Sequence, residues 1–484
     1  MNIKKALAGV RVKAGENIRD ADIDGIADDS RKVRPGDLFV ALKGYSTDAS
    51  KFIGDALDAG ARAVVTDKDF GSRPGVSKIL VDDTRSALSA IAGNFYGHPS
   101  RKLKVIGITG TNGKTTISYL LESVLKASGA SAGVIGTISY RLNGRTLPAV
   151  NTTPGALELQ RMLSEMAASG TGYAVIEVSS HSLDQGRVEG ILFDAGVFTN
   201  LTSDHLDYHK TVSNYFKAKK RLFDKLKTDG CAVLNIDDSK AASLRKSIKN
   251  RVMTYGVKGK ADVAAADVAL SMDGTRFTVR APDMRFDIRT KLIGIHNVSN
   301  ILAASSVAIA LKVPEEAIME GIASMERVPG RLEAVDAGQD FKVLVDFAHT
   351  EDALFNVLSL LKGLAKSRMI TVFGCGGDRD RTKRPLMGKV ACKYSDHVIV
   401  TSDNPRFEDP DAIIREIEKG IKGRFSNYDI IPDRKEAIAK ALGLASKDDI
   451  VVLAGKGHEA YQMIRDEAIP FDDRAVALSI LKRS

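Results

Sequence analysis

A glycine-rich segment at residues 109–116 has the residue types of a phosphate-binding loop. It follows an apolar run over residues 104–108 that predicts a strand, and a helical pattern comes after it. Glycines let the backbone approach phosphate oxygens, Lys114 can neutralise phosphate charge, and Thr115 can ligate Mg²⁺. The strict G-x-x-x-x-G-K-[ST] spacing is not met, because Ile108 occupies its first position. We still predict a phosphate site formed by Gly110, Thr111, Asn112, Gly113, Lys114, Thr115 and Thr116.

Acidic and histidine side chains after the next predicted strands could bind a metal ion. Glu177 lies in an apolar run, where a carboxylate is costly unless it is paired or bound to metal. It either makes a satisfied core hydrogen bond or supports Mg²⁺ beside the phosphate loop. His205 and His209 have the spacing of a zinc pair on a helix, but Leu206 stands where a zinc hydrolase has glutamate. Two interpretations stay open: one histidine contacts magnesium or phosphate, or both histidines lie on the surface.

Four polar or glycine-rich loops follow predicted strands near the end of the chain. They lie at residues 346–349, 374–380, 402–406 and 454–459. Ligands of open α/β sheets bind at the carboxyl ends of strands, so these loops predict a second ligand face. Arg379 and Arg406 could each hold a carboxylate with two parallel hydrogen bonds. The ligand is therefore expected to be an anion or a zwitterion.

Alternating strands and helices must position these groups. Predicted strands cover residues 38–42, 63–66, 78–81, 104–108, 174–178, 195–199, 232–234, 343–345, 370–373, 398–400 and 450–453. One predicted helix spans residues 86–96, and a second begins after the phosphate loop and ends near Gly129. The apolar face of the second helix comprises Ile117, Leu120, Leu121, Val124 and Leu125.

Turn-forming segments near residues 98–100 and 328–331 divide the chain into three parts. Because helix-length segments separate the strands in each part, the predicted fold class is α/β with three domains. We place an N-terminal domain at residues 1–99, a central phosphate-loop domain at 100–331 and a C-terminal Rossmann-like domain at 332–484.

Composition and charge exclude several classes of protein. The 484 residues are 44% hydrophobic and 27% charged, which suits globular domains and not a disordered chain. There is no apolar stretch of ~18 residues, no signal-peptide pattern and no C-x-x-C motif among three cysteines, so we predict a cytoplasmic protein without membrane insertion. A net charge of +9 suits anionic small molecules. The absence of tryptophan and of a long basic cluster argues against a nucleic-acid partner.

Several motifs together resemble those of the Mur ligase family over essentially the whole chain. They are Asp29-Ser30-Arg31, the Gly-Thr-Asn-Gly-Lys-Thr loop, Asn151-Thr152-Thr153-Pro154, the segment 177–183, Gly330-Arg331-Leu332-Glu333 and the loop 374–380. The resemblance implies a ligase that uses ATP and Mg²⁺ to join meso-2,6-diaminopimelate to UDP-N-acetylmuramoyl-L-alanyl-D-glutamate through an acyl phosphate. It also implies a cytoplasmic enzyme of peptidoglycan precursor synthesis, which we expect to be a monomer.

The resemblance implies roles for individual residues. In the N-terminal domain, Ser30 contacts the uridine diphosphate group. The muramoyl-dipeptide side is held by Asn151, Thr152, Thr153, Ser179, Gln185 and Arg187. The ATP site is completed by Asn297, Arg331 and Asp346. The catalytic residues are Lys114, Glu177, His205 and Lys219, and the magnesium ligands are Thr115, Glu177, His205 and Lys219.

Lys219 matches the lysine that the family carbamylates with CO₂, a change that converts a cation into an anion able to hold Mg²⁺. Sequence alone favours a different interpretation, in which Lys219 belongs to a solvated basic run over residues 217–221. The modification is therefore an expectation from the resemblance.

The resemblance also implies an amino-acid site of Arg379, Asp403, Asn404, Pro405, Arg406, Gly455 and Glu459. Arg406 should favour diaminopimelate, whose second carboxylate it can bind, over L-lysine, which ends in an ammonium group. The chain departs from the usual pattern at Asp48-Ala49-Ser50, at Phe347 in place of tyrosine and at Glu351 in place of proline.

Three other functions stay open. An L-lysine-adding Mur ligase would differ mainly at Arg406. A folylpolyglutamate-type ligase shares the fold and the ATP loop, but the first-domain motifs argue against it. A P-loop ATPase or switch that ligates nothing would leave the four C-terminal loops unexplained.

Overall fold

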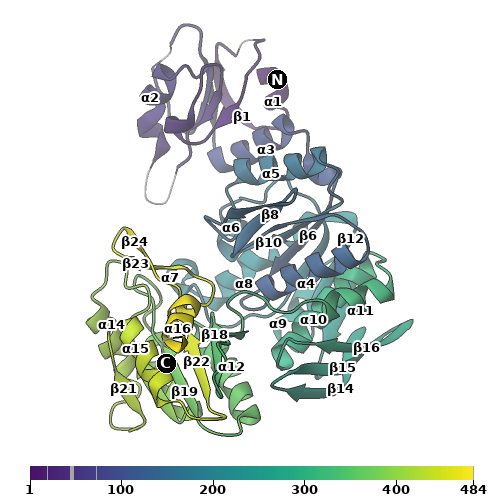
Figure 1. The fold of residues 1–484 in the computed structure, drawn as a ribbon. Helices are drawn as coiled ribbons and strands as arrows, with labels where there is room; N and C mark the ends of the chain where they lie inside the picture. Colours follow the sequence, from purple (N-terminus) through teal and green to yellow (C-terminus); the bar gives the residue numbers. More distant parts are fainter. Residues whose placement is uncertain (19, 44–47, 72, 483–484) are drawn as a thin grey trace.

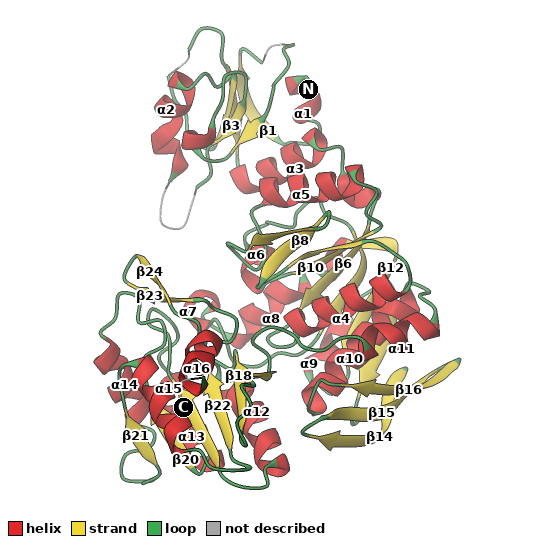
Figure 2. Cartoon of the chain, viewed as in Figure 1, coloured by secondary structure: helices red, strands yellow, loops and turns green. Residues whose placement is uncertain are grey.

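The computed structural model describes residues 1–18, 20–43, 48–71 and 73–482. Three sheets follow one another along the chain, each with its own helices (Figures 1 and 2). This arrangement confirms the three-domain α/β prediction. The domain boundaries at residues 99 and 331 stay predictions.

The N-terminal sheet has the order β1-β5-β4-β3-β2, and only β1 runs antiparallel. Its strands are β1 Val12–Glu16, β2 Ile26–Ala27, β3 Leu38–Val40, β4 Ala63–Thr66 and β5 Ser77–Val81. Its helices are α1 Ile3–Ala6, α2 Ile53–Asp58 and α3 Thr84–Phe95, with 3₁₀ turns η1 Ser30–Lys32, η2 Ala49–Phe52 and η3 Pro99–Arg101. Helix α3 begins two residues before its predicted start, because the Asp83 carboxylate accepts hydrogen bonds from the backbone N–H groups of Arg85 and Ser86.

The central sheet has eleven strands in the order β16-β15-β14-β13-β12-β11-β6-β10-β7-β8-β9. They are β6 Lys104–Thr109, β7 Ala132–Ile135, β8 Ser139–Leu142, β9 Arg145–Pro148, β10 Tyr173–Glu177, β11 Phe193–Phe198, β12 Leu226–Asn235, β13 Arg251–Gly256, β14 Val263–Ser271, β15 Gly274–Ala281 and β16 Met284–Thr290. The helices are α4 Lys114–Ala127, α5 Ala156–Ala168, α6 Ser180–Asp184, α7 Leu206–His209, α8 Val212–Lys220, α9 Lys240–Arg245, α10 Ile295–Ala310 and α11 Glu315–Ala323, with η4 Phe223–Lys225. The predicted apolar face of α4 is confirmed, since all five of its residues are buried in the core shared with α10 and α11.

The C-terminal sheet has the order β17-β18-β22-β19-β20-β21, and only β17 runs antiparallel. Its strands are β17 Glu333–Ala334, β18 Lys342–Asp346, β19 Met369–Phe373, β20 His397–Val400, β21 Tyr428–Ile430 and β22 Ile450–Ala454, and a separate hairpin joins β23 Tyr461–Ile464 to β24 Glu467–Pro470. The helices are α12 Glu351–Leu364, α13 Lys383–Tyr394, α14 Pro410–Glu418, α15 Arg434–Leu444 and α16 Asp473–Leu481. Because β18, β22, β19 and β20 are parallel, the four loops predicted as a ligand face leave the sheet at one edge.

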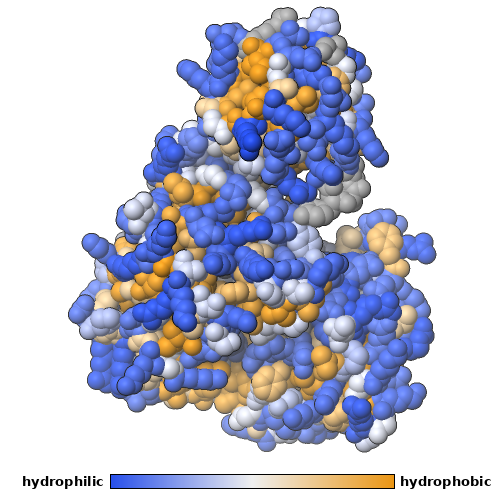
Figure 3. Space-filling view, turned by 180° about the vertical axis from the view of Figure 1, so that it is seen from behind, coloured by the Kyte–Doolittle hydropathy of each residue, from blue (hydrophilic) through white to orange (hydrophobic). Residues whose placement is uncertain are grey.

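The C-terminal domain lies beside the central domain, whereas the N-terminal domain projects from the other end of the central domain (Figure 1). From behind, the surface is hollowed between the projecting domain and the C-terminal lobe, and most of it is hydrophilic (Figure 3). Within the described ranges, no helix has the length and apolar character needed to cross a bilayer.

Candidate active site

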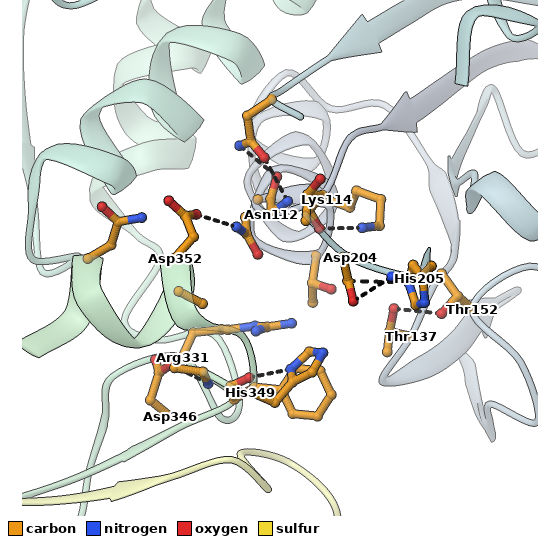
Figure 4. Close-up of a pocket in the computed structure, with 18 of the residues that line it drawn as sticks. Asn112, Lys114, Thr137, Thr152, Asp204, His205, Arg331, Asp346, His349 and Asp352 are labelled. Atoms are coloured by element: carbon orange, nitrogen blue, oxygen red, sulfur yellow. Dashed lines mark hydrogen bonds and ion pairs between the residues drawn. The ribbon is translucent and has the colours of Figure 1, made fainter. Parts of the chain in front are cut away.

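A cavity of about 470 Å³ lies between the central and C-terminal domains and collects most of the predicted site residues. From the central domain it is lined by Thr111, Asn112, Gly113, Lys114, Thr115, Thr116, Thr152, Ser179, His205, Lys219 and Asn297. From the C-terminal side it is lined by Arg331, Asp346, Arg379, Asp403, Asn404, Arg406, Gly455 and Glu459. Figure 4 shows side chains from the two domains pointing toward one another across this space. The two ligand faces predicted separately from the sequence therefore form one site.

The phosphate loop connects β6 to α4 at the centre of the large sheet. Gly110 and Gly113 have φ angles of 150° and 92°, a backbone region that favours glycine. The Lys114 ammonium folds back over the loop and donates hydrogen bonds of 2.9 Å to the carbonyl oxygens of Gly110 and Thr111. Burial holds the pKa of Lys114 below its usual value. An anion at the start of α4 would meet this cation and the free N–H groups of the first helical turn.

Glu177 ends β10 beside the phosphate loop, in register with Ile108 of the adjacent strand β6. Its carboxylate accepts hydrogen bonds from Thr115 Oγ1 at 2.9 Å and from the backbone N–H and Oγ1 of Thr137 at 3.1 and 2.9 Å. Glu177 therefore makes the hydrogen bonds expected of a satisfied core carboxylate, and its role in supporting Mg²⁺ stays a prediction. The same contacts place a carboxylate and a hydroxyl, two oxygen ligands suited to Mg²⁺, beside the phosphate loop.

Lys219 is buried, so the solvated-run interpretation was wrong for this residue. Only 1% of its surface is exposed, and its Nζ donates a 2.8 Å hydrogen bond to the Gly110 carbonyl. Tyr215, four residues before Lys219, and Leu222, three residues after it, are buried as well, and so is Ala218. Residues three and four apart lie on the same face of a helix, so Lys219 lies on the buried face. Burial, and then the charge of Lys114, hold the pKa of Lys219 well below its usual value.

The two histidines do not form a zinc pair. His205 precedes α7 with a left-handed φ of 54°, and its Nε2 lies 3.4 Å from Asp204 Oδ2. His209 ends the same short helix, is buried and has Nε2 2.9 Å from Ser180 Oγ. Burial lowers the pKa of His205 below its usual value, which favours a neutral imidazole at pH 7. Of these two histidines, His205 lines the cavity and His209 does not. The surface interpretation was wrong for His209, which is buried.

The residues predicted to hold the muramoyl-dipeptide side share a hydrogen-bond network at the central-domain wall. Thr153 Oγ1 donates to the Glu177 carbonyl at 2.8 Å and accepts from the Ser179 backbone N–H at 3.1 Å. Arg187 donates to the Thr153 carbonyl at 2.9 Å and to Gln185 Oε1. Thr152 Oγ1 lies 3.1 Å from Thr137 Oγ1, and the Asn151 backbone bonds Tyr140. Ser30 lies apart from this network, in η1 of the N-terminal domain.

The domain junction carries the three residues predicted to complete the ATP site. Asp346 Oδ2 accepts the Leu332 backbone N–H at 2.7 Å and thereby ties the strand end to the segment after residue 331. The Arg331 guanidinium lies 4.8 Å from the Phe347 ring centre. Burial lowers the pKa of Arg331 and raises the pKa of Asp346. Asn297, buried in the first turn of α10, accepts a hydrogen bond from Asn300.

The loops predicted to bind the amino acid meet in one part of the cavity. Arg406 has a left-handed φ of 52° and donates from Nη1 to the Gly377 carbonyl at 2.7 Å. Arg379 donates to the Asp378 carbonyl at 3.0 Å. Asn404 Nδ2 donates to Glu459 Oε2 at 2.8 Å. Asp403 Oδ2 is buried and has no hydrogen-bond partner among the residues that the structure describes. Pro405, between these residues, does not line the cavity.

Several cavity residues were missed by the sequence reasoning. Asn112 Nδ2 donates a 3.0 Å hydrogen bond to Asp352 Oδ2, which joins the phosphate loop to α12 of the other domain (Figure 4). Lys383, at the start of α13, donates from Nζ to the His349 carbonyl at 2.8 Å. Thr137 was also missed. Asp352 and Lys383 each lie in a helical turn just after a predicted ligand loop, and this position was the available signal.

Comparison with protein-family models matches three consecutive parts of the chain. The "Mur ligase family, catalytic domain" matches residues 22–96, the "Mur ligase middle domain" residues 108–308 and the "Mur ligase, glutamate ligase domain" residues 330–457. The chain belongs to the Mur ligase family. It is therefore an ATP-dependent ligase that forms an amide bond.

Two curated full-length relatives of this Mur ligase carry the name UDP-N-acetylmuramoyl-L-alanyl-D-glutamate–2,6-diaminopimelate ligase. The protein from Caldanaerobacter subterraneus subsp. tengcongensis is 46% identical over 100% of both chains, and that from Geobacillus thermodenitrificans is 44% identical over 98% of both. A solved structure with the same name is 34% identical, has a TM-score of 0.70 and covers 100% of this chain and 99% of its own. Mycobacterium tuberculosis folylpolyglutamate synthase, at 18% identity, 77% coverage of this chain, 92% of its own and a TM-score of 0.63, shares the fold alone.

Proposed function

We propose that this Mur ligase joins meso-2,6-diaminopimelate to UDP-N-acetylmuramoyl-L-alanyl-D-glutamate at the expense of ATP, in peptidoglycan precursor synthesis. Full-length relatives bear the name of that reaction. The observation that carries the proposal is the meeting, in one cavity, of a phosphate loop and two arginines suited to a carboxylate, Arg379 and Arg406. A ligase that activates one substrate with ATP and binds an amino acid needs both features in one space.

The proposed reaction has two steps. The terminal carboxylate of the D-glutamate attacks the γ-phosphorus of ATP, which gives an acyl phosphate and ADP. The charge of Lys114 and the N–H groups at the start of α4 stabilise the transferring phosphoryl group. The amine of diaminopimelate then attacks the acyl carbon, the amide bond forms, the amine loses a proton and inorganic phosphate leaves. Asn297, Arg331 and Asp346 would bind the nucleotide from the domain junction.

Mg²⁺ fits the donors beside the phosphate loop. Thr115 and Glu177 supply oxygen, and the neutral imidazole of His205 lines the same cavity. Among the described residues, no group of three or more histidine, cysteine or acidic side chains could by itself hold a metal ion. This is the expected situation for Mg²⁺, which is commonly held by one or two carboxylates together with substrate phosphates. When bound, the ion supplies charge neutralisation at the phosphates.

A carbamate on Lys219 also fits its surroundings. CO₂ reacts with an unprotonated amine, and burial beside Lys114 favours that form of Lys219. The carbamate would exchange a buried cation for an anion that compensates the Lys114 charge and serves the metal. Mass spectrometry of the intact protein prepared with and without bicarbonate, compared with Lys219→Gln, tests this assignment by a readout other than activity.

The substrate carrying the uridine nucleotide would extend from the cavity toward the N-terminal domain. Thr152 and Ser179 line the cavity, and Asn151, Thr153, Gln185 and Arg187 lie in the network behind them. Ser30 would contact the uridine diphosphate at the other end. A monomeric state and a cytoplasmic location remain predictions.

Phosphate release from ATP and Mg²⁺ in the presence of UDP-N-acetylmuramoyl-L-Ala-D-Glu tests the proposal. We expect release that requires meso-diaminopimelate and that L-lysine does not support. Release with L-lysine alone would retain the ligase class and refute the role given to Arg406. Release that is indifferent to every amino acid would refute the ligase reaction and favour a non-ligating ATPase.

A further inference from the structure

Lys456 is a buried cation directly behind the amino-acid end of the cavity. It follows β22 in the loop after Gly455, has no exposed surface and does not itself line the cavity. Its ammonium donates to Asn404 Oδ1 at 3.1 Å, to Glu459 Oε2 at 3.3 Å and to the Tyr461 carbonyl at 2.5 Å. These three acceptors use all three N–H donors of a lysine.

Two of these acceptors belong to the proposed amino-acid site. Asn404 Oδ1 accepts from Lys456 and from the Met463 backbone, so the amide nitrogen of Asn404 must face the other way, toward Glu459. Both hydrogen bonds to the Glu459 carboxylate end on Oε2. Within the described part of the chain, the other oxygen of Glu459 is therefore left for a ligand. Lys456 thus sets the orientation of an amide and a carboxylate that line the cavity.

A second carboxylate faces the same end of the cavity. Asp403 Oδ2 is buried with no hydrogen-bond partner in the described ranges, and a Cβ added to Gly455 would lie 2.6 Å from it. Burial, and then the charge of Asp403, raise the pKa of Glu459, whereas Lys456 opposes that rise. Lys456 therefore helps Glu459 stay ionised close to Asp403. Two carboxylates opposite Arg379 and Arg406 would match a ligand group that carries both an ammonium and a carboxylate.

We propose that Lys456 is a positioning residue that orients Asn404 and Glu459 for the zwitterionic end of the amino-acid substrate and thereby strengthens discrimination against a substrate with only an ammonium there. The inference rests on the proposed function. Its physical basis is charge balance. The charges of Arg379, Asp403, Glu459 and Asp378 all act on Arg406, and Lys456 offsets part of the negative charge at Glu459. Without Lys456, the carboxylates at this end of the cavity would favour a lone ammonium more strongly, and the preference for a zwitterionic end would weaken.

The test compares Lys456→Met and Lys456→Arg with the unchanged full-length ligase. Lys456→Met should raise the KM for diaminopimelate about ten- to a hundredfold, as expected for a lost buried charge-assisted hydrogen bond. The KM values for ATP and the uridine nucleotide substrate, and kcat at saturation, should stay within about threefold. The preference for diaminopimelate over L-lysine should fall, and Lys456→Arg should recover part of both losses. Lys447→Met, at an exposed lysine of the same domain, serves as the matched control.

Three results would overturn the inference. One is an unchanged KM for diaminopimelate in Lys456→Met. Another is an equal loss for all three substrates together with a lowered melting temperature, which would show a structural role only. The third concerns the double variant Glu459→Gln/Lys456→Met. If Lys456 acts through Glu459, Lys456→Met should change the diaminopimelate KM much less in the Glu459→Gln background than in the parent. Equal changes in both backgrounds would exclude action through Glu459. Failure of the unchanged ligase to require diaminopimelate would instead refute the proposed function.

Discussion

Arg406→Ala is expected to impair binding of diaminopimelate selectively. Of the five N–H donors of the guanidinium, one is bonded to the Gly377 carbonyl, and within the part of the chain that is described a pair is left for a carboxylate. Burial and the charge of Arg379 lower the pKa of Arg406, so an incoming anion relieves an unfavourable environment. Two charge-assisted hydrogen bonds at about 1.5–3 kcal/mol each, reduced by desolvation of the ligand, give a loss of about 3–4 kcal/mol. The KM for diaminopimelate should therefore rise by a factor of roughly 10²–10³.

The substitution leaves backbone strain nearly unchanged. At φ 52°, arginine and alanine are strained alike, so the melting temperature of Arg406→Ala should stay close to that of the parent. The assay is initial-rate phosphate release with varied diaminopimelate at saturating ATP and uridine nucleotide substrate. Arg381→Ala is the matched control, because Arg381 pairs with Glu416 and does not line the cavity. A diaminopimelate KM within about threefold of the parent value, or an equal rise in the KM for ATP, would refute the reasoning.

Four further outcomes are expected. Lys114→Ala should abolish ADP formation, and its circular dichroism spectrum should match that of the parent. Retained turnover would contradict the placement of Lys114 at the phosphates. Lys219→Gln should lose most activity and show no bicarbonate-dependent mass increase, since carbamylation needs the amine. Gly455→Ala should raise the diaminopimelate KM, because the added Cβ would displace Asp403 Oδ2. The KM for ATP, which should stay unchanged, is the control. Burial lowers the pKa of His296 to about 4, below the ~6.5 expected when unfolded, so stability present above pH 6.5 is lost as pH falls toward 4. His296→Gln should flatten the pH dependence of the unfolding free energy by up to about 1.4 kcal/mol per pH unit near pH 5. An unchanged slope would refute a neutral, half-buried imidazole at His296.

The strands and the phosphate loop could be predicted because their signals are local. A run of β-branched residues, a glycine turn and an amphipathic helix appear within about twenty consecutive residues, and each is favoured by its own backbone and side-chain energetics. The apolar face of α4 is an example, since every residue of the predicted stripe is buried.

Lys219 shows where such reasoning failed. Its neighbours in sequence are basic, and a run of charges is usually solvated. The spacing that places Lys219 beside Tyr215 and Leu222 on a buried face was present in the sequence. An apolar pattern cannot reveal it, because a lysine is scored as polar and is assigned to the solvated side of a helix. Burial of this amine against the Gly110 carbonyl depends on how α8 packs on the phosphate loop.

The sequence by itself determined three α/β units, a phosphate loop and a set of polar strand-end loops. Only the tertiary structure decided that the phosphate loop and the C-terminal loops share one cavity, and that Asn112 and Asp352 meet across the domain junction. It also decided that Lys456 lies behind Asn404. The physical reason is distance along the chain. Contacts between residues 50 to 240 positions apart are set by how domains and loops pack, and no local pattern of residue types encodes that packing.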